Sequence, residues 1–133
     1  MYRRNNISQS EANKILDMSD DELRSNIQVS DGKKRCSSLQ GIEIEVGWDN
    51  PEGAIIHHFW IDAKLRGNGI GTIMCEELIT QLKQISRLKF IHTSISKSGG
   101  STKYVLKKCG FDDIVEHNQG STDSKVIEGR LRL

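Results

Sequence analysis

The sequence predicts an α/β fold in which helices flank a central mixed sheet. Three observations lead to this prediction: two helical patterns open the chain, apolar runs alternate with helical patterns after them, and two apolar runs close it. The expected order is two helices followed by β-β-α-β-α-β-β, which is typical of an α/β layer structure. A chain of 133 residues has the length of a single domain, so we expect one domain over residues 1–133.

The N-terminal part is expected to be helical. Residues 1–7 carry no periodic pattern and are predicted to be a flexible end, and Ser10–Met18 is predicted to form a short helix. Ser19-Asp20-Asp21-Glu22 is a capping box, with serine at the N-cap and glutamate three residues later. It predicts a helix that runs to about Val29 and is ended by Asp31-Gly32.

Two apolar runs in the middle of the chain predict an antiparallel hairpin. Ile42, Ile44 and Val46 alternate with glutamates, which is the pattern of a half-buried strand. Residues 54–62 are more continuously apolar, as in a central strand that is covered on both faces. For residues 36–39 two expectations stay open: a short extra strand, or a sheet that is cut back at this edge.

In the second half of the chain, helical patterns again alternate with strand patterns. Met74, Leu78, Leu82 and Ile85 recur at three- and four-residue steps, which predicts a helix from 72 to about 85. A strand over 88–96 and a short helix over 102–109, ended by Gly110, are expected next. Two closing strands are predicted at 111–116 and 125–133.

Composition narrows the class of protein. Lys and Arg number 19 against 18 Asp and Glu, which argues against binding nucleic acid through bulk charge. No apolar stretch approaches the roughly 20 residues that span a bilayer, and no apolar run follows the charged start, so neither a membrane partner nor a secretory signal is expected. The three cysteines lack metal-ligand spacing, so we expect no metal site and reduced thiols in a cytoplasmic protein.

The segment from Arg66 to Thr72 carries the most chemical information. It lies between an apolar strand pattern and a helical pattern, and three of its residues are glycines. Glycines free the backbone to turn tightly, and a helix start adds unpaired N–H donors, so the segment is a candidate receptor for phosphate or pyrophosphate. Thr72 stands where the dinucleotide fingerprint needs glycine, and no lysine follows as a P-loop requires.

The pattern Arg66-x-x-Gly69-x-Gly71 resembles the pyrophosphate loop of the GNAT family of acyl-CoA-dependent N-acetyltransferases. The segment that ends in Gly110-Phe111 is similar to the end of that family's last helix, and the resemblance covers about 54–116. It implies a single-domain GNAT-like fold with a largely antiparallel sheet, splayed between strands 54–62 and 88–96 to admit the cofactor. It implies acetyl-CoA as that cofactor, bound by Phe59, Trp60, Ile61, Arg66, Gly67, Asn68, Gly69, Ile70, Gly71 and Thr72.

Acetyl transfer to an amine needs a base for the amine and an acid for the departing thiolate. We favour His57 as base, because imidazole titrates near neutrality and the resemblance places a catalytic histidine nine residues before Arg66. The alternative is that His57 and His58 are packing residues on opposite faces of a buried strand. Glu45 is a candidate to attract the amine or relay its proton, with a solvated strand face as the alternative, and His92 is a weaker candidate base.

The acid is a departure from the family. The usual tyrosine position holds Leu106, which has no proton to donate. Tyr104 is the nearby candidate, with Ser98, Ser101 or solvent as the alternatives. The resemblance implies an N-acetyltransferase in which a primary amine, on a small molecule or a protein, attacks the thioester directly. The alternative is a catalytically weak acyl-CoA-binding module that acts as a sensor or contacts a protein. The sequence does not decide the identity of the acceptor amine or the length of the acyl chain. It also leaves open whether the closing strands form a homodimer.

Overall fold

The structure, a computed structural model, describes residues 7–29, 36–37, 42–47, 50–59, 61–98, 102–118 and 125–133. The predicted α/β order is confirmed, with one further short strand and one 3-10 turn. The elements are α1 (Gln9–Leu16), α2 (Asp20–Ser25), β1 (Cys36–Ser37), β2 (Ile42–Val46), β3 (Gly53–Phe59), η1 (Ala63–Leu65), α3 (Ile70–Lys83), β4 (Phe90–Ser98), α4 (Thr102–Lys108), β5 (Asp112–Asn118) and β6 (Lys125–Arg132).

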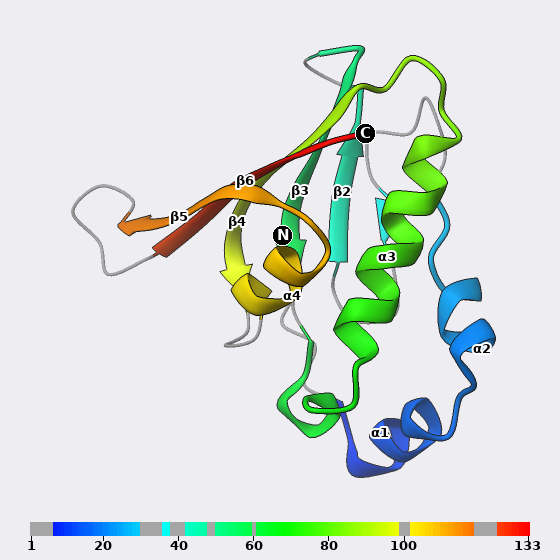
Figure 1. Cartoon of the computed structure of the whole chain (residues 1–133). Coiled ribbons are helices and arrows are strands. Elements are labelled where there is room, and N and C mark those ends of the chain that lie inside the picture. The colour runs from blue at the N-terminus through cyan, green and yellow to red at the C-terminus, as the bar shows by residue number, and fades with distance from the viewer. Residues whose placement is uncertain are drawn as a thin grey trace.

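The strands form one six-stranded sheet in the order β1-β2-β3-β4-β6-β5. Only the central pair, β3 and β4, is parallel among the described strand pairs, and the predicted hairpin of β2 and β3 is antiparallel. Figure 1 shows α3 running along the sheet with α2 beside it, while α4 follows the end of β4. Residues 38–39, part of the open expectation for 36–39, lie outside the described residues.

The sheet has one apolar face and one polar face. The cross-strand pairs put a set of nearly or fully buried side chains on a single face: Ile44, Val46, Ala54, Ile56, Ile91 and Ile95. They share one core with the buried side of α3, which includes Met74, Leu78 and Leu82. Ile55, His57 and His92 alternate with these positions and are only half-buried, so the opposite face is the one open to polar ligands.

The ladder between β3 and β4 is broken at one point. Ile56 pairs with Thr93, but His58 pairs with Lys97, so one residue of β3 stands against residues 94–96 of β4. The ladder between β2 and β3 shifts at the same point. This is where splaying of the sheet was expected.

The break also corrects the expected alternation of His57 and His58. Bulges place two successive residues against one partner and reverse the alternation of side chains beyond them. Both histidines are half-buried, and Phe59 is fully buried. Phe59 lies near Gly71 of α3, whereas His57 contacts Glu45, which pairs with Ile55 on the polar face.

Two element ends differ from the prediction for local reasons. The second strand ends at Phe59 rather than Asp62, because the Asp62 side chain caps η1 by accepting the backbone N–H of Lys64 at 2.9 Å. Helix α2 ends at Ser25 rather than about Val29. The backbone N–H of Val29 instead donates to the side chain of Gln81 on α3 at 2.8 Å, and residues 31–32 lie outside the described residues.

Asp62 ties the start of the described chain to η1. It is 3% exposed, and its carboxylate also accepts the backbone N–H of Ile7 at 3.3 Å. Burial alone would raise the pKa of Asp62, but the two backbone hydrogen bonds and the charges of Lys64 and Arg66 outweigh it and hold the pKa below its ordinary value of 3.8. The ionised form is therefore the one that stabilises the fold.

We predict that Asp62→Ala lowers the free energy of unfolding at pH 7 by about 1–3 kcal/mol, because two backbone N–H groups lose their charged acceptor. Since the folded pKa lies below the unfolded one, this contribution is present above pH 3.8 and is lost as the pH falls further. Urea unfolding of both proteins at pH 7 and near pH 3 measures it. A difference that is the same at both values would contradict the assignment.

Candidate functional site

The loop between η1 and α3 leaves its backbone uncovered at two glycines. Gly67 and Gly69 have φ angles of +81° and +73°, and a Cβ at either position would meet no atom within 4 Å. Residues other than glycine rarely adopt this conformation. The side-chain amide of Asn68 donates to the carbonyls of Leu65 and Arg66 at 3.2 and 3.1 Å and so holds the turn from within. The loop thus offers backbone in open space.

Helix α3 begins at Ile70, two residues before the expected Thr72, and its first turn has no side-chain cap. The first hydrogen bond of the helix runs from the backbone N–H of Ile73 to the carbonyl of Gly69. The N–H groups of the preceding residues are therefore available to a ligand. By contrast, Ser8 and Ser19 cap α1 and α2 with their hydroxyls. An uncapped helix start favours an anion.

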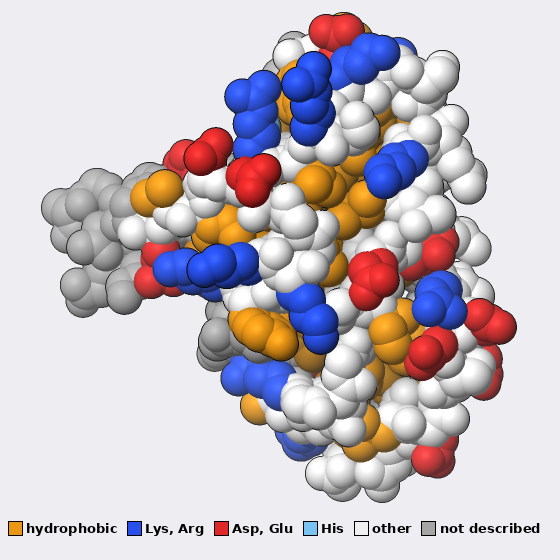
Figure 2. Space-filling view, in the orientation of Figure 1, with side chains coloured by type: hydrophobic (Ala, Val, Ile, Leu, Met, Phe, Trp, Pro, Cys, Tyr) orange, Lys and Arg blue, Asp and Glu red, His pale blue; other side chains and the backbone are white. Residues whose placement is uncertain are grey.

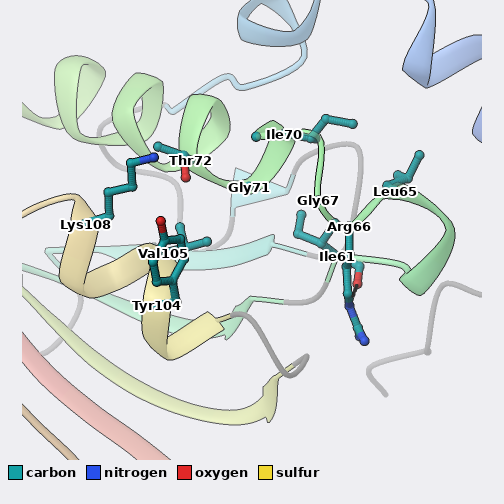
Figure 3. A pocket seen from close by; sticks show the side chains of 11 residues that line it. Ile61, Leu65, Arg66, Gly67, Ile70, Gly71, Thr72, Tyr104, Val105 and Lys108 are labelled. Carbon is teal, nitrogen blue, oxygen red and sulfur yellow. Dashed lines mark hydrogen bonds between the residues drawn. The ribbon is translucent and has the colours of Figure 1, made fainter.

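A cavity of about 370 Å³ lies between this loop and α4. In Figure 3, Lys108 reaches from α4 with its amino group directed toward Thr72, whereas the guanidinium of Arg66 points away from α4. The Nε of Arg66 donates to the carbonyl of Ile61 at 3.2 Å. The lining residues are Ile61, Leu65, Arg66, Gly67, Gly69, Ile70, Gly71, Thr72, Tyr104, Val105 and Lys108.

Gly71 sets how closely α3 approaches its neighbours. A Cβ there would lie 3.3 Å from Cγ2 of Val105 and 3.4 Å from Cγ1 of Ile61. Here the requirement is space rather than backbone conformation, because Gly71 is not among the glycines with positive φ. Thr102 of α4 adds a hydrogen bond of 3.0 Å from its hydroxyl to the carbonyl of Phe59. These contacts join β3, α3 and α4 around the cavity.

His57 and Glu45 form a hydrogen-bonded pair on the polar face of the sheet. Nε2 of His57 lies 3.0 Å from Oε1 of Glu45, and the two side chains are 35% and 11% exposed. The other oxygen, Oε2 of Glu45, is buried and makes no hydrogen bond within the described part of the chain. When Glu45 is ionised, Nε2 carries the proton toward it, which leaves Nδ1 as the nitrogen with a free lone pair.

The remaining residues predicted from the sequence lie partly at the loop cavity and partly elsewhere. Tyr104 is 64% exposed and lines the loop cavity, which neither His57 nor Glu45 does. Leu106, at the family's tyrosine position, is fully buried. Phe59 does not line the cavity, Ile61 does, and Trp60 lies outside the described residues.

Sequence reasoning missed Lys108. Its amino group also lies 5.8 Å from the ring centre of Tyr104. A lysine in the last turn of a helix is ordinarily read as compensating the helix dipole, and only the docking of α4 against α3 reveals its place in the cavity.

The surface shown in Figure 2 mixes basic, acidic and apolar side chains without a stripe of one sign. Within the described ranges, no helix combines the length and apolarity needed to cross a bilayer. Nor do three His, Cys, Asp or Glu side chains gather there as metal ligands would.

Comparison with known proteins identifies the family. The family model of the acetyltransferase (GNAT) family matches residues 36–111, which is more than half of the chain. This match begins before the 54–116 of the resemblance, and it contains the loop and both predicted catalytic residues of the sheet. No curated protein matches the sequence.

One solved structure supports the fold. The crystal structure of a protein described as a GNAT-family acetyltransferase from Desulfovibrio desulfuricans aligns with a TM-score of 0.54 at 11% identity, over 79% of this chain and 64% of its own. The chain thus spans less than two thirds of that protein. An acetyltransferase from Thermus thermophilus (TM-score 0.49, 12% identity, 77% and 67% covered) and a ribosomal-protein-alanine N-acetyltransferase from Brucella melitensis (0.48, 12%, 100% and 83%) align less well.

We predict that the effect of Gly71→Ala on the free energy of unfolding depends on the side chain at Val105, because the two positions lie close together. The added methyl crowds Val105, at a cost of about 1–3 kcal/mol that the better helix propensity of alanine offsets by about 1 kcal/mol. In a Val105→Ala background the methyl instead fills vacated space, so urea unfolding should give a coupling of at least about 0.5 kcal/mol.

Gly69→Ala is the matched control for this double mutant. Its Cβ meets nothing, and its cost of about 1–2 kcal/mol comes from the left-handed backbone alone. It should therefore add to Val105→Ala without coupling. Additive behaviour of Gly71→Ala as well would show that α3 and α4 do not touch there as described.

Proposed function

Because the chain belongs to the acetyltransferase (GNAT) family, we propose that it is an N-acetyltransferase that transfers an acetyl group from acetyl-CoA to a primary amine. The observation that carries the proposal is the cavity in which the uncovered loop, the uncapped start of α3 and Lys108 meet. These features suit the pyrophosphate of a CoA thioester, which needs backbone donors and a cation.

The residues present fit the cofactor in a specific way. Backbone N–H groups from Gly67 to Thr72 would bind the pyrophosphate in the open space beside the two glycines. Lys108 would supply the positive charge, while Arg66 holds the loop by its bond to Ile61. The carbonyl of Ile61, a residue that lines the cavity, accepts one side-chain hydrogen bond and would keep a second lone pair for the pantetheine arm.

The pair on the polar face would prepare the amine. When bound, acetyl-CoA supplies a thioester whose C–S bond breaks as the new C–N bond forms. Nδ1 of His57 takes a proton from the acceptor ammonium, and Glu45 holds the imidazole through Nε2 and stabilises its charged form. Glu45 is in this role a positioning residue. Tyr104, whose ring lines the cavity, stays the predicted source of the proton for the departing thiol.

We further propose direct transfer without an acylated cysteine, in the cytoplasm. Cys75 is fully buried, and its hydrogen bond with Cys109, together with burial, raises the pKa of its thiol well above the ordinary range. A buried and protonated thiol is a poor nucleophile. Among the described cysteine side chains, Cys75 and Cys109 are free thiols.

The cofactor site predicts a specific lysine effect. Lys108→Met should weaken acetyl-CoA binding about tenfold, because a charge-assisted bond to phosphate is lost. Lys107→Met, at an exposed neighbouring position outside the cavity, should change it less than about twofold. Isothermal titration calorimetry with acetyl-CoA at two salt concentrations measures both. Equal effects of the two variants would show that Lys108 is not the cation that binds the phosphates. If the unaltered protein gave no heat with acetyl-CoA, the cofactor assignment would be wrong.

From the proposed role of the His57–Glu45 pair, we predict that its variants lower turnover without weakening acetyl-CoA binding. His57→Gln should lower kcat by about a hundredfold or more and remove the acidic limb of the pH–rate profile, with acetyl-CoA affinity unchanged. Glu45→Gln keeps an acceptor for Nε2 but loses the charge, so kcat should fall about tenfold with little change in KM. Thiol release with a panel of amines is the assay.

The same assay separates the two candidate functions. Normal rate and pH profile in His57→Gln would reject that base. Acetyl-CoA binding without thiol release for any amine would favour the alternative function, a binding module that does not turn over.

A further inference from the structure

Two cysteines lie on the helix faces that pack against each other where α4 meets α3. Gly71 and Cys75 are four residues apart in α3 and so share one of its faces. Val105 and Cys109 are also four residues apart, and the backbone N–H of Cys109 donates to the carbonyl of Val105 at 3.0 Å, as in a helix. A Cβ at Gly71 would lie 3.3 Å from Cγ2 of Val105. The next turn of each segment therefore brings Cys109 to Cys75.

The contacts of the two sulfurs agree with this placement. The thiol of Cys75 is hydrogen-bonded to that of Cys109. Sγ of Cys109 also lies 4.0 Å from the carbonyl oxygen of Thr72, one turn before Cys75 on α3. The sulfur of Cys109 thus lies against this face of α3 and touches two successive turns of it.

The two thiols differ in exposure and in acidity. Cys75 is fully buried, whereas Cys109 is partly exposed just after the end of α4. The hydrogen bond from Cys75 and the charge of Lys108 hold the pKa of Cys109 below its ordinary value of 9.0, although burial and the charge of Glu76 act in the opposite direction. A reagent from solvent therefore meets Cys109 first, and meets it as the thiol that ionises more readily.

We propose that Cys75 and Cys109 form a redox-sensitive modification site, at which a hydroperoxide oxidises the pair to a disulfide that joins α3 to the end of α4. The sulfur of Cys109 attacks hydrogen peroxide and becomes a sulfenic acid, and the departing hydroxide takes up the thiol proton to leave as water. The sulfur of Cys75 then attacks the sulfenic sulfur, and the second hydroxide leaves with the proton of Cys75. Two thiols and one peroxide thus give one disulfide and two waters.

Burial does not prevent Cys75 from taking the second step. It makes Cys75 a poor nucleophile toward a cofactor or a reagent in solvent, but the sulfenic acid forms on a side chain that Cys75 already contacts. Contact turns the second step into an intramolecular one. Cys109 also follows the last residue of α4 and precedes Gly110, where the chain turns with a φ angle of +98°. A small shift of this helix end is enough to bring the sulfurs together.

The disulfide is expected to change the loop cavity at one end. Thr72 and Lys108 line that cavity, and Lys108 precedes Cys109 in the chain. A covalent S–S bond is about 2 Å long, so its formation draws Cys109 toward Cys75 and away from Thr72, and Lys108 moves with it. Oxidation should therefore weaken the binding of phosphate at the start of α3. This consequence rests on the proposed function, whereas the formation of the disulfide does not.

Disulfide mapping tests the modification site directly. The unaltered protein is treated with hydrogen peroxide, its remaining thiols are blocked, and it is digested without reduction. We expect two peptides joined through Cys75 and Cys109, a loss of two hydrogens from the intact mass, and recovery of both thiols with dithiothreitol. In Cys75→Ala the reaction should stop at the sulfenic acid of Cys109, which dimedone labels.

Cys109→Ser and Cys36→Ser are the matched variants. Cys109→Ser should abolish the disulfide, and Cys36→Ser, which changes a residue of β1, should leave it intact. A disulfide that includes Cys36 would overturn the inference. So would further oxidation of Cys109 in the unaltered protein while Cys75 stays a free thiol, because the two sulfurs would then not be in reach of each other.

Isothermal titration calorimetry with acetyl-CoA measures the effect on the cavity. We expect the oxidised protein to have a dissociation constant about three- to tenfold above that of the same sample after reduction, and Cys109→Ser to respond to peroxide by less than about twofold. A mapped disulfide with unchanged affinity would overturn the link to the cavity. Absence of heat in both redox states would count against the proposed cofactor, and the mapping would still decide whether the cysteines form the site.

Discussion

The division of the candidate site between the two faces of the sheet depends on one break in hydrogen-bond register at the centre of the sheet. Strands β3 and β4 pair in parallel up to Ile56 and Thr93, and beyond them β4 contains two more residues than β3. A parallel pair needs a crossover connection, here α3, and the break lies just before the chain turns into it. Because the alternation reverses there, His57 stays on the polar face while Phe59 turns into the core near Gly71. A regular strand would have put both on one face.

Most of the fold was readable from the sequence because its signals are local. The capping box at Ser19, the three- and four-residue spacing of Met74, Leu78 and Leu82, and the glycines of the 66–72 loop each depend on only a few neighbouring residues. Element ends were less accurate where a side chain competes with the regular pattern. Asp62 ends β3 early by capping η1, and an αL residue, Gly69, starts α3 early.

The site was readable only in part, since its contacts join residues that are distant along the chain. The loop and His57 were predicted from local pattern and family resemblance, and they stay predictions. That Glu45 meets His57 follows from the register of β2 against β3, which puts Glu45 opposite Ile55. The place of Lys108 in the cavity and the contact of Cys75 with Cys109 both depend on how α4 docks on α3. No spacing in a single sequence encodes such pairings, so both were missed.

The two faces of the sheet also bear on the order of events. The loop cavity is lined by α3 and α4, while the His57–Glu45 pair lies on the polar face and does not line that cavity. A cofactor in the cavity and an amine at the pair would therefore not compete for space, and both could be bound at once. Simultaneous binding removes the need for a stored acyl group, which agrees with the burial of Cys75. It also requires the two reactants to meet near the break in strand register, where one residue of β3 stands against residues 94–96 of β4.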